Sequence, residues 1–349
     1  MQVLDNALAS LALAQPQAFS NLAVHPLLGS LPGRAADYLV LDEALARQAA
    51  RVTEVSEGGS VPELAFHNEG DVAVLLLHGE ELVGARQNRV LNTTVLVGGG
   101  RKVPIPVSCV EQGRWSYNSP EFSSADRALF VKARAKQVRQ VSAALRDSGR
   151  YSADQREVWA DIAEKSARFN SRSPTDAMSE VFEQQRQTVD AYVDAIPAMP
   201  GQCGAVFAID GKIVGLEYFD TAATFAHYLP KLVRSYALDA VETVASGPNS
   251  HLPPVEEVVR QFIKDLLSTA AERFPGVGEG ENMRLESETL AGSALVLGER
   301  VIHCAAFKSA AAHRGAQLAP SRLSRARRVR PPRIQTGFSP DLPPDSSPG

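Results

Sequence analysis

The chain has 349 residues, of which 44% are hydrophobic and 22% charged, and its formal net charge is -4 at pH 7. This is ordinary globular composition, with ample length for a sizeable core. The three sparse cysteines exclude a disulfide scaffold and a CxxC zinc site. No apolar run approaches the roughly 18 to 20 residues of a membrane helix. The first residues lack the basic segment of a signal peptide. We therefore expect a cytoplasmic protein without membrane contact.

Residues 20–117 are predominantly strand-like. The clearest strand is the apolar run Val72 to Leu77, which polar and glycine residues bound on both sides, so we expect a buried central strand. One helix interrupts this region, and Asp42 is its expected N-cap.

A pair of strands follows. Residues 87–97 are expected to form one long strand, Gly98-Gly99-Gly100 a turn, and residues 103–111 the next strand. Pro104 and Pro106 place this last strand at an edge, or leave it paired on one side only, because proline donates no backbone hydrogen bond.

The region from 118 to 200 is helical in character. Three boxes, each a serine followed three residues later by an acid or amide, predict helix starts at Ser123, Ser152 and Ser173.

The region from 201 to 307 mixes strands and helices. Gly204 to Ile209, the turn Asp210-Gly211, and Lys212 to Phe219 form the strongest hairpin signal in the chain. Helices are expected at about 221–237 and 254–272, and strands at about 283–290, 293–297 and 300–307. The order of elements predicts an α+β fold in a single domain, residues 1–307, rather than regular βαβ winding.

Residues 308–349 differ in composition from the rest. They hold eight basic and two acidic residues, for a net charge of +6, which leaves -10 for residues 1–307, and they contain seven of the 22 prolines. We expect a disordered basic tail. No aromatic residues interleave with its arginines, so we favour a solvated extension over a nucleic-acid-binding arm.

The densest set of chemically capable side chains lies between Leu75 and Arg114. Alternate side chains of a strand share a face, so Cys109 and Glu111 are expected to point the same way. A hairpin through the triple glycine would bring carboxylates, amides and guanidinium groups together, as in a polar ligand pocket. The candidates for catalysis are Glu80, Glu81, Cys109 and Glu111, and those for ligand binding are Gln87, Asn88, Arg89, Ser108 and Arg114.

The cysteine supports two alternatives. A cysteine phosphatase loop needs five residues between the thiolate and the arginine, whereas four separate Cys109 from Arg114. A nucleophile paired with a histidine depends on a fold that the sequence does not show. We favour a buried, inert Cys109.

The charged candidates also leave alternatives open. Glu80, Glu81 and Glu111 suit a divalent metal or acid–base chemistry, and equally an ion-pair network with Arg89 or Arg114. The arginines suit a phosphate or carboxylate ligand, although pairing with neighbouring acids is the commoner role. The sequence contains no standard nucleotide-binding loop, so it identifies no cofactor.

The runs GEELVGARQNRVLNTTVLV and IPVSCVEQGRW resemble the bacterial family named for its genomic association with ADP-ribosylglycohydrolase and rhodanese-phosphatase proteins. The likeness extends through residues 173–182, the 204–219 hairpin and the closing strands 292–307, and so covers nearly all of residues 20–307. The resemblance implies a link to ADP-ribose or NAD-derived metabolites and a partner enzyme of that metabolism. All nine candidate residues fall on the most distinctive motifs.

Three hypotheses follow. The first is an enzyme domain that binds or processes a phosphorylated or ADP-ribose-like small molecule, with a glutamate as acid–base or metal-binding group and Arg89 and Arg114 holding the anion. The second is a non-catalytic module that senses such a ligand or docks onto a partner enzyme. The third makes the cluster a structural polar network, with the function at an interface.

Overall fold

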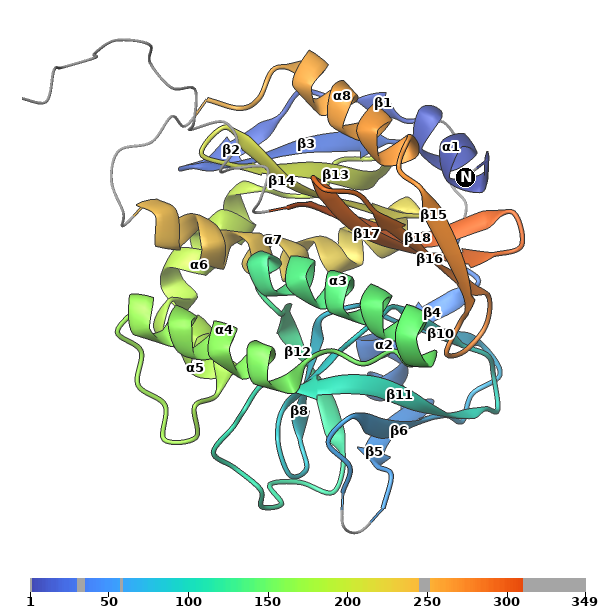
Figure 1. Ribbon diagram of the computed structural model, residues 1–349, viewed down its shortest axis with the longest axis vertical. Coiled ribbons are helices and arrows are strands. Elements are labelled where there is room, and N and C mark those ends of the chain that lie inside the picture. The colour runs from blue at the N-terminus through green and yellow to red at the C-terminus, as the bar shows by residue number, and fades with distance from the viewer. Residues whose placement is uncertain (1, 30–34, 57–58, 245–251, 310–349) are drawn as a thin grey trace, which may run out of the picture.

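A large antiparallel sheet forms one half of the protein and a closed barrel forms the other (Figure 1). The computed structural model describes residues 2–29, 35–56, 59–244 and 252–309. The strand-rich N-terminal region and the helices of the middle and C-terminal regions confirm the predicted α+β class. The extent of the domain stays a prediction, and the predicted tail lies outside the described residues except for Lys308, which ends a strand, and Ser309.

The large sheet is built from both ends of the chain. Its strands run in the order β1-β3-β13-β14-β18-β17-β16-β15, and β2 also pairs with β3. All neighbours are antiparallel. The strands are β1 (Ala12–Leu13), β2 (Gln17–Phe19), β3 (Leu22–Leu28), β13 (Gln202–Ile209), β14 (Lys212–Phe219), β15 (Ala271–Pro275), β16 (Glu281–Glu286), β17 (Leu290–Leu297) and β18 (Arg300–Lys308).

Helices cover both faces of this sheet. On the outer face, α1 (Gln2–Ala9) and α8 (Glu256–Leu267) pack their apolar sides against residues such as Cys304 and Ala306. On the inner face, α3 (Val131–Ser148) and α7 (Ala222–Val244) lie between the sheet and the rest of the molecule (Figure 1). The sheet therefore buries apolar side chains on both faces, and its strands alternate between two separate cores.

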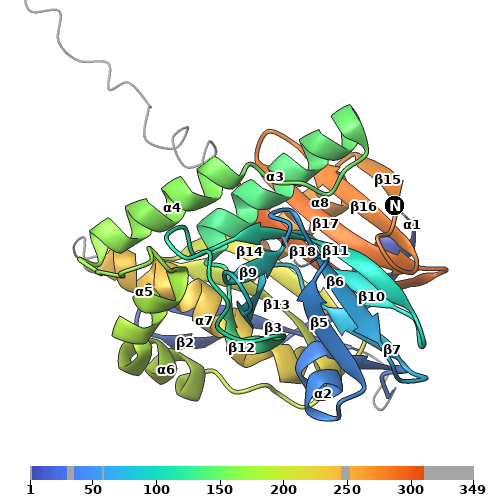
Figure 2. The ribbon, with the colours of Figure 1, turned by 90° about the horizontal axis from the view of Figure 1, so that it is seen from below.

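The barrel closes in the order β11-β6-β5-β12-β8-β9, and a three-stranded sheet, β10-β7-β4, adjoins it (Figure 2). Apolar side chains such as Phe66 and Leu82 fill its core. The barrel strands are β5 (Ala50–Glu54), β6 (Glu63–Asn68), β8 (Glu80–Gly84), β9 (Arg89–Leu91), β11 (Lys102–Cys109) and β12 (Phe122–Ala128). The remaining elements are β4 (Tyr38–Val40), β7 (Ala73–Leu76), β10 (Val95–Val97), α2 (Leu41–Ala46), α4 (Gln155–Arg168), α5 (Met178–Gln184) and α6 (Arg186–Ala195).

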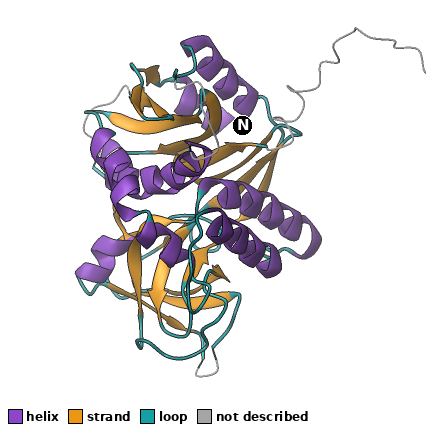
Figure 3. Cartoon of the chain, turned by 90° about the vertical axis from the view of Figure 1, so that its left-hand side faces the viewer, coloured by secondary structure: helices purple, strands orange, loops and turns teal. Residues whose placement is uncertain are grey.

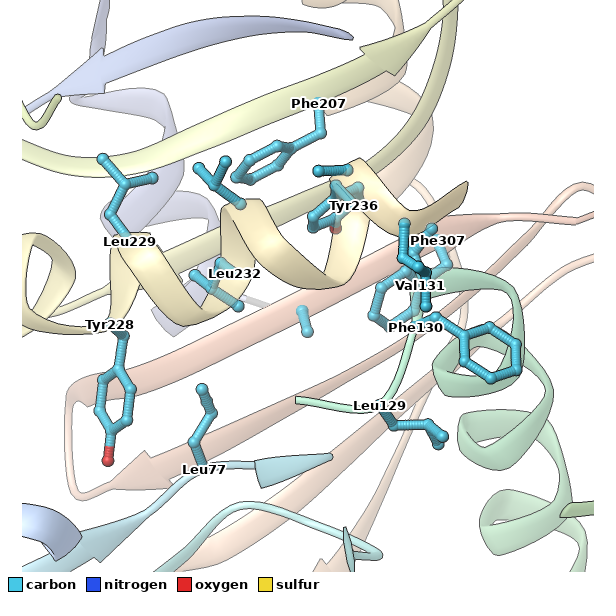
Figure 4. Packing of buried hydrophobic residues seen from close by; sticks show 14 of the residues in the cluster. Leu77, Leu129, Phe130, Val131, Phe207, Tyr228, Leu229, Leu232, Tyr236 and Phe307 are labelled. Atoms are coloured by element: carbon cyan, nitrogen blue, oxygen red, sulfur yellow. The ribbon is translucent and has the colours of Figure 1, made fainter. Parts of the chain in front are cut away.

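The largest apolar core joins the two halves around α7 (Figure 4). Phe207 of β13 stacks on Tyr236 of α7, with ring centroids 3.9 Å apart and an interplanar angle of 5°. Leu77 and Leu129, from the barrel side, belong to the same cluster. Sheet, helices and barrel thus share buried contacts. In the side view, helices lie between the large sheet and the barrel (Figure 3).

Several predicted elements are confirmed. The hairpin β13–β14 turns at Asp210 and Gly211, whose φ angles of 51° and 71° give the left-handed two-residue turn that Asp-Gly predicts. The apolar run after Val72 forms β7, the central strand of the three-stranded sheet. The proline-containing half of β11 pairs with β6, and its second half pairs with β9.

The single long strand predicted over residues 87–97 is wrong. The chain forms β9 and β10, which belong to different sheets, and Asn92-Thr93-Thr94 separates them. A β-like composition predicts extended backbone but not which partner strand each half finds.

The predicted helix caps at Ser123, Ser152, Ser173 and Asp42 are also wrong. The helices that follow Ser152 and Ser173 begin at Gln155 and Met178, and their N-caps are Asp154 and Ala177. Ser123 lies within strand β12, and α3 begins only at Val131. Asp42 is not an N-cap but lies inside the first turn of α2, where its carboxylate contacts His227 at 2.8 Å and Lys231 at 3.2 Å. For Ser123 and Asp42, a tertiary contact overrides the local signal.

Candidate functional site

The structure divides the nine predicted residues into three groups. Most of them form what we call the barrel-end cluster, whereas Glu80 and Ser108 each belong to a different polar network. The barrel-end cluster consists of Glu81, Gln87, Asn88, Arg89, Cys109, Glu111 and Arg114.

Asn88 holds the barrel-end cluster together. Its side-chain amide donates to Glu81 Oε1 at 3.3 Å, and its backbone N–H donates to Glu111 Oε2 at 3.1 Å. Its side-chain oxygen Oδ1 accepts from Arg114 Nη2 at 3.1 Å. The residue that directly precedes β9 therefore links both carboxylates to the guanidinium.

Glu111 is an ionised, fully partnered carboxylate. Besides the amide of Asn88, it accepts from Arg114 Nη2 at 2.7 Å and from Thr175 Oγ1 at 2.8 Å. Burial alone would raise the pKa of this carboxyl, but the three hydrogen bonds outweigh burial and lower the pKa below its ordinary value. Arg114 is anchored in turn by the carbonyl of Ala85 at 2.7 Å.

Glu81 is the more deeply buried of the two carboxylates, with a side chain that is 0% exposed. Burial raises the pKa of Glu81, and the nearby charge of Glu111 raises it further. The contact with Arg127 at 2.5 Å and the hydrogen bond from Asn88 lower this pKa. Burial outweighs both, so the pKa of Glu81 is raised. The two carboxylates of the cluster are thus shifted in opposite directions.

Arg89 has unused hydrogen-bonding capacity. Its side chain is fully buried, and Nη1 donates to the backbone oxygen and Oε1 of Gln87, both at 3.1 Å. Its Nε and Nη2 have no acceptor among the described residues. Gln87 is itself held by the carbonyl of Glu111 at 2.8 Å, and the ring of Trp115 lies 5.7 Å from the guanidinium carbon.

Cys109 lies beside Arg89 but is not a prepared nucleophile. The two residues are direct partners in the β9–β11 register, so their side chains share a face. Burial raises the pKa of the Cys109 thiol to about 11, although the charge of Arg89 opposes this. A thiol with this pKa is protonated at neutral pH, which supports the inert alternative for Cys109 over the nucleophilic one.

Glu80 points away from the cluster. Neighbouring residues of a strand face opposite sides, so Glu80 and Glu81 cannot share a site within β8. Glu80 Oε1 accepts from Lys231 Nζ at 2.5 Å and from Ser124 Oγ at 2.7 Å, and Oε2 accepts from the backbone of Leu77 at 3.2 Å. Lys231 of α7 is therefore the counter-ion of Glu80.

Ser108 is separated from Cys109 by the same alternation. Its hydroxyl donates to Asn92 Oδ1 at 2.7 Å, and Gln137 of α3 donates to the same oxygen at 2.9 Å. Ser108 therefore contributes to a network between the barrel and α3.

The three glutamates do not fit a metal site. Each is paired with its own cation: Glu80 with Lys231, Glu81 with Arg127, and Glu111 with Arg114. Among the residues that the structure describes, no group of three or more histidine, cysteine, aspartate or glutamate side chains could hold a metal ion. A carboxylate that already carries a buried ion pair is a poor ligand for a hard cation.

Some side chains of the site were not predicted. Thr175 and Arg127 reach the cluster from outside the predicted segment and carry no sequence signal that links them to it. Trp115 directly follows Arg114 in the distinctive motif and could have been included. Glu54 of β5 lies near enough to act electrostatically on Arg89, and its Oε2 has no partner among the described residues.

Comparison with known proteins identifies a family. The model of the ARG and rhodanese-phosphatase-superfamily-associated protein domain, ARPP-1, matches residues 10–307. The chain belongs to the ARPP-1 family. No curated protein and no solved structure matches it. None of the described helices of this ARPP-1 domain is long and apolar enough to cross a membrane.

The Glu111 contacts lead to a pH-dependent prediction. Glu111→Gln should lower the free energy of unfolding by about 1–3 kcal/mol at neutral pH, because it weakens hydrogen bonds to a charged group. The folded pKa of Glu111 lies below the ordinary value of 4.5, so its contribution is complete above that pH and is lost as the pH falls through the folded pKa. Urea unfolding at several pH values should show the two proteins converging in acid.

The matched control for Glu111→Gln is Glu69→Gln, whose carboxylate pairs with Arg51 while both side chains are 47% exposed. It should change stability by no more than about 0.5 kcal/mol. An equal loss in both variants, or a Glu111→Gln loss independent of pH, would contradict the pairing described above.

The buried thiols lead to a second prediction. All three cysteines are free and buried, and burial raises the pKa of Cys109 and of Cys203 to about 11. A disulfide reagent at about pH 8 should therefore modify none of them rapidly in the folded protein and all three after unfolding in urea. Rapid native labelling of Cys109, located by peptide mass spectrometry, would restore the nucleophile hypothesis.

Proposed function

We propose that this ARPP-1 domain binds a phosphorylated small molecule of the ADP-ribose type at the barrel-end cluster. The observation that carries the proposal is Arg89, a fully buried guanidinium whose Nε and Nη2 lack an acceptor among the described residues. A buried donor without an acceptor costs about 1–3 kcal/mol, and a charged donor costs more. A phosphate oxygen is the acceptor that the planar guanidinium matches best.

Neighbouring groups suit the other parts of such a ligand. Glu54 offers an open carboxylate oxygen, and carboxylates commonly accept hydrogen bonds from ribose hydroxyls. The ring of Trp115 is 45% exposed and can stack on a base. Phosphate, ribose and base would thus each find a suitable group within one region of the domain.

Access requires movement of the loop that carries Trp115. This loop, between β11 and β12, places the ring near both Arg86, at 5.6 Å, and Arg89, at 5.7 Å. Arg89 is fully buried in this arrangement, so the ligand would exchange the cation–π contact for a charged hydrogen bond. The loop would then close over the bound molecule.

The binding prediction uses isothermal titration with ADP-ribose, NAD, AMP and ribose. We expect ADP-ribose to bind, and Arg89→Met to weaken binding by at least about tenfold, because the phosphate loses a charged donor. Trp115→Ala should weaken binding, whereas Trp115→Phe should retain most of it because the aromatic face is kept.

The control is Arg51→Met, which removes an exposed arginine paired with Glu69. It should leave the affinity unchanged. Absence of binding by the unaltered protein, or equal binding by Arg89→Met, would refute the proposal, and thermal unfolding of each variant verifies that it is folded.

A catalytic role is the second candidate, supported by the opposite pKa shifts of Glu81 and Glu111. Two carboxylates with separated pKa values can serve as acid and base in hydrolysis. Their ion pairs with Arg127 and Arg114 favour the binding role instead, either as a sensor or as a module that docks onto a partner enzyme.

Turnover assays separate these roles. If the domain is an enzyme, incubation with ADP-ribose should release product, and Glu81→Gln and Glu111→Gln should each slow release by about 10²-fold or more. If it is a sensor, no product forms at any enzyme concentration, and both variants still bind ADP-ribose. Chromatography of the incubated nucleotide distinguishes the outcomes.

A further inference from the structure

A second buried polar group lies where the inner face of the large sheet meets the barrel. We call it the interface cluster. Every member is at most 4% exposed. It consists of His78, Asn92, Thr93 and Thr94 from the barrel side, Arg134 and Gln137 from α3, and Glu217, Asn282, Arg284 and His303 from the sheet.

Strand register places the sheet residues on one face. Glu217 pairs with Ala305, Ala305 with Ser293, and Ser293 with Arg284, so these four residues form one row across β14, β18, β17 and β16. His303 and Asn282 lie two residues along their strands from this row, and therefore point to the same side. The two members between Glu217 and Arg284 are the small residues Ala305 and Ser293.

The barrel side contributes the segment that separates β9 from β10. Thr93 Oγ1 accepts from Asn282 Nδ2 at 3.0 Å and from Arg284 Nη2 at 3.2 Å. Thr94 Oγ1 accepts from the backbone of His78 at 3.1 Å and lies 2.9 Å from His303 Nδ1. The residues at the break between β9 and β10 thus contact the large sheet directly.

The cluster holds more positive than negative charge. Arg134 Nη1 contacts Glu217 Oε1 at 2.6 Å, and His303 Nε2 lies 3.2 Å from the other carboxylate oxygen. Within the cluster, Glu217 is the one carboxylate for two buried guanidinium groups. Arg134 Nε and Nη2 have no acceptor among the described residues.

Arg284 is the least compensated charge. Its Nε and Nη1 have no acceptor in the described part of the chain, and its one hydrogen bond goes to a neutral hydroxyl. The ring of Tyr151 lies 5.5 Å from its guanidinium carbon. Burial lowers the pKa of Arg284 to about 10, because removing such an ion from water without a counter-ion is unfavourable.

The cluster also has two open acceptors. Gln137 donates its amide to Asn92, so its oxygen, 2.8 Å from His78 Nε2, accepts from that nitrogen. His78 is neutral, because burial and the charges of Arg134 and Arg284 hold its pKa well below the ordinary range, and its Nδ1 is left as an acceptor without a partner among the described residues. Asn282 Oδ1 is open in the same way.

We propose that the interface cluster binds a compact oxyanion that carries its own hydroxyl, of which hydrogen phosphate is the simplest example. Its charged oxygens would accept from the four open nitrogens of Arg134 and Arg284, and its hydroxyl would donate to His78 Nδ1 or Asn282 Oδ1. Sulfate has the same shape but no hydrogen at neutral pH, and so satisfies the donors alone. The members of this cluster are at most 4% exposed, and none of them belongs to the barrel-end cluster, so the two proposed sites are separate.

The test is performed on the full chain after exhaustive dialysis against phosphate-free buffer. Released phosphate is measured by ³¹P NMR on the denatured protein, and binding by titration calorimetry with phosphate and sulfate at equal ionic strength. We expect one phosphate per chain and sulfate affinity lower by at least about tenfold. No retained phosphate together with no binding at millimolar phosphate would overturn the proposal, and equal affinity for sulfate would overturn the assignment of the hydroxyl.

Arg284→Met keeps the length and apolar stem of the side chain and should reduce phosphate affinity by at least about tenfold. Arg273→Met is the matched control, because Arg273 of β15 is 44% exposed and pairs with Glu281. Its phosphate affinity should equal that of the unaltered protein. Unchanged affinity in Arg284→Met would place the anion elsewhere and overturn the proposal.

Asn282→Asp keeps the test decisive if Arg284→Met does not fold. The side chains of Asn282 and Arg284 both contact Thr93, so the substitution places a carboxylate beside Arg284. We expect this variant to have a higher midpoint of thermal unfolding in phosphate-free buffer and to bind no phosphate. Retained binding in this variant would contradict the site. Arg89→Met separates the two ligand sites: loss of phosphate binding there would assign the anion to the barrel end and overturn this proposal, whereas retention supports it.

Discussion

The break in the chain at Asn92-Thr93-Thr94 is the constraint on which the arrangement of the two halves depends. Before it, β9 completes the barrel, and after it, β10 joins a different sheet. The three side chains at the break bind α3, the barrel strand β11 and the large sheet. Because buried polar groups are stable only when they are hydrogen-bonded, these contacts fix how the barrel sits on the sheet more specifically than apolar packing alone.

Strand alternation explains why the predicted site is only partly assembled. Glu80 and Glu81 are adjacent, as are Ser108 and Cys109, and each pair is divided between two faces. The number of polar side chains in a segment of sequence therefore overstates how many of them lie in one site. The residues that do meet are joined by Asn88, an amide that can donate and accept at once.

Much of the fold could be predicted from local patterns. The Asp210-Gly211 turn, the apolar run of β7 and the strands near the end of the described chain all follow from periodicity and turn chemistry. The helix start at Ser123 could not be predicted correctly, because its box lies in a strand that pairs with β8 and β5. The partners of Glu80 and Glu111, Lys231 and Thr175, are distant in sequence, and only the fold brings them into contact.

The shortness of β9 has a consequence for the two proposed sites. Arg89 is its first residue and Leu91 its last, and Asn92 follows directly, so one three-residue strand connects the barrel-end cluster to the interface cluster. Because β9 has only three residues, few backbone torsion angles can change to absorb a displacement of Arg89 before it reaches Asn92. A displacement of Arg89 on ligand binding would therefore reach Asn92, and thermodynamic linkage would make the resulting effect of each ligand on the affinity for the other equal in both directions.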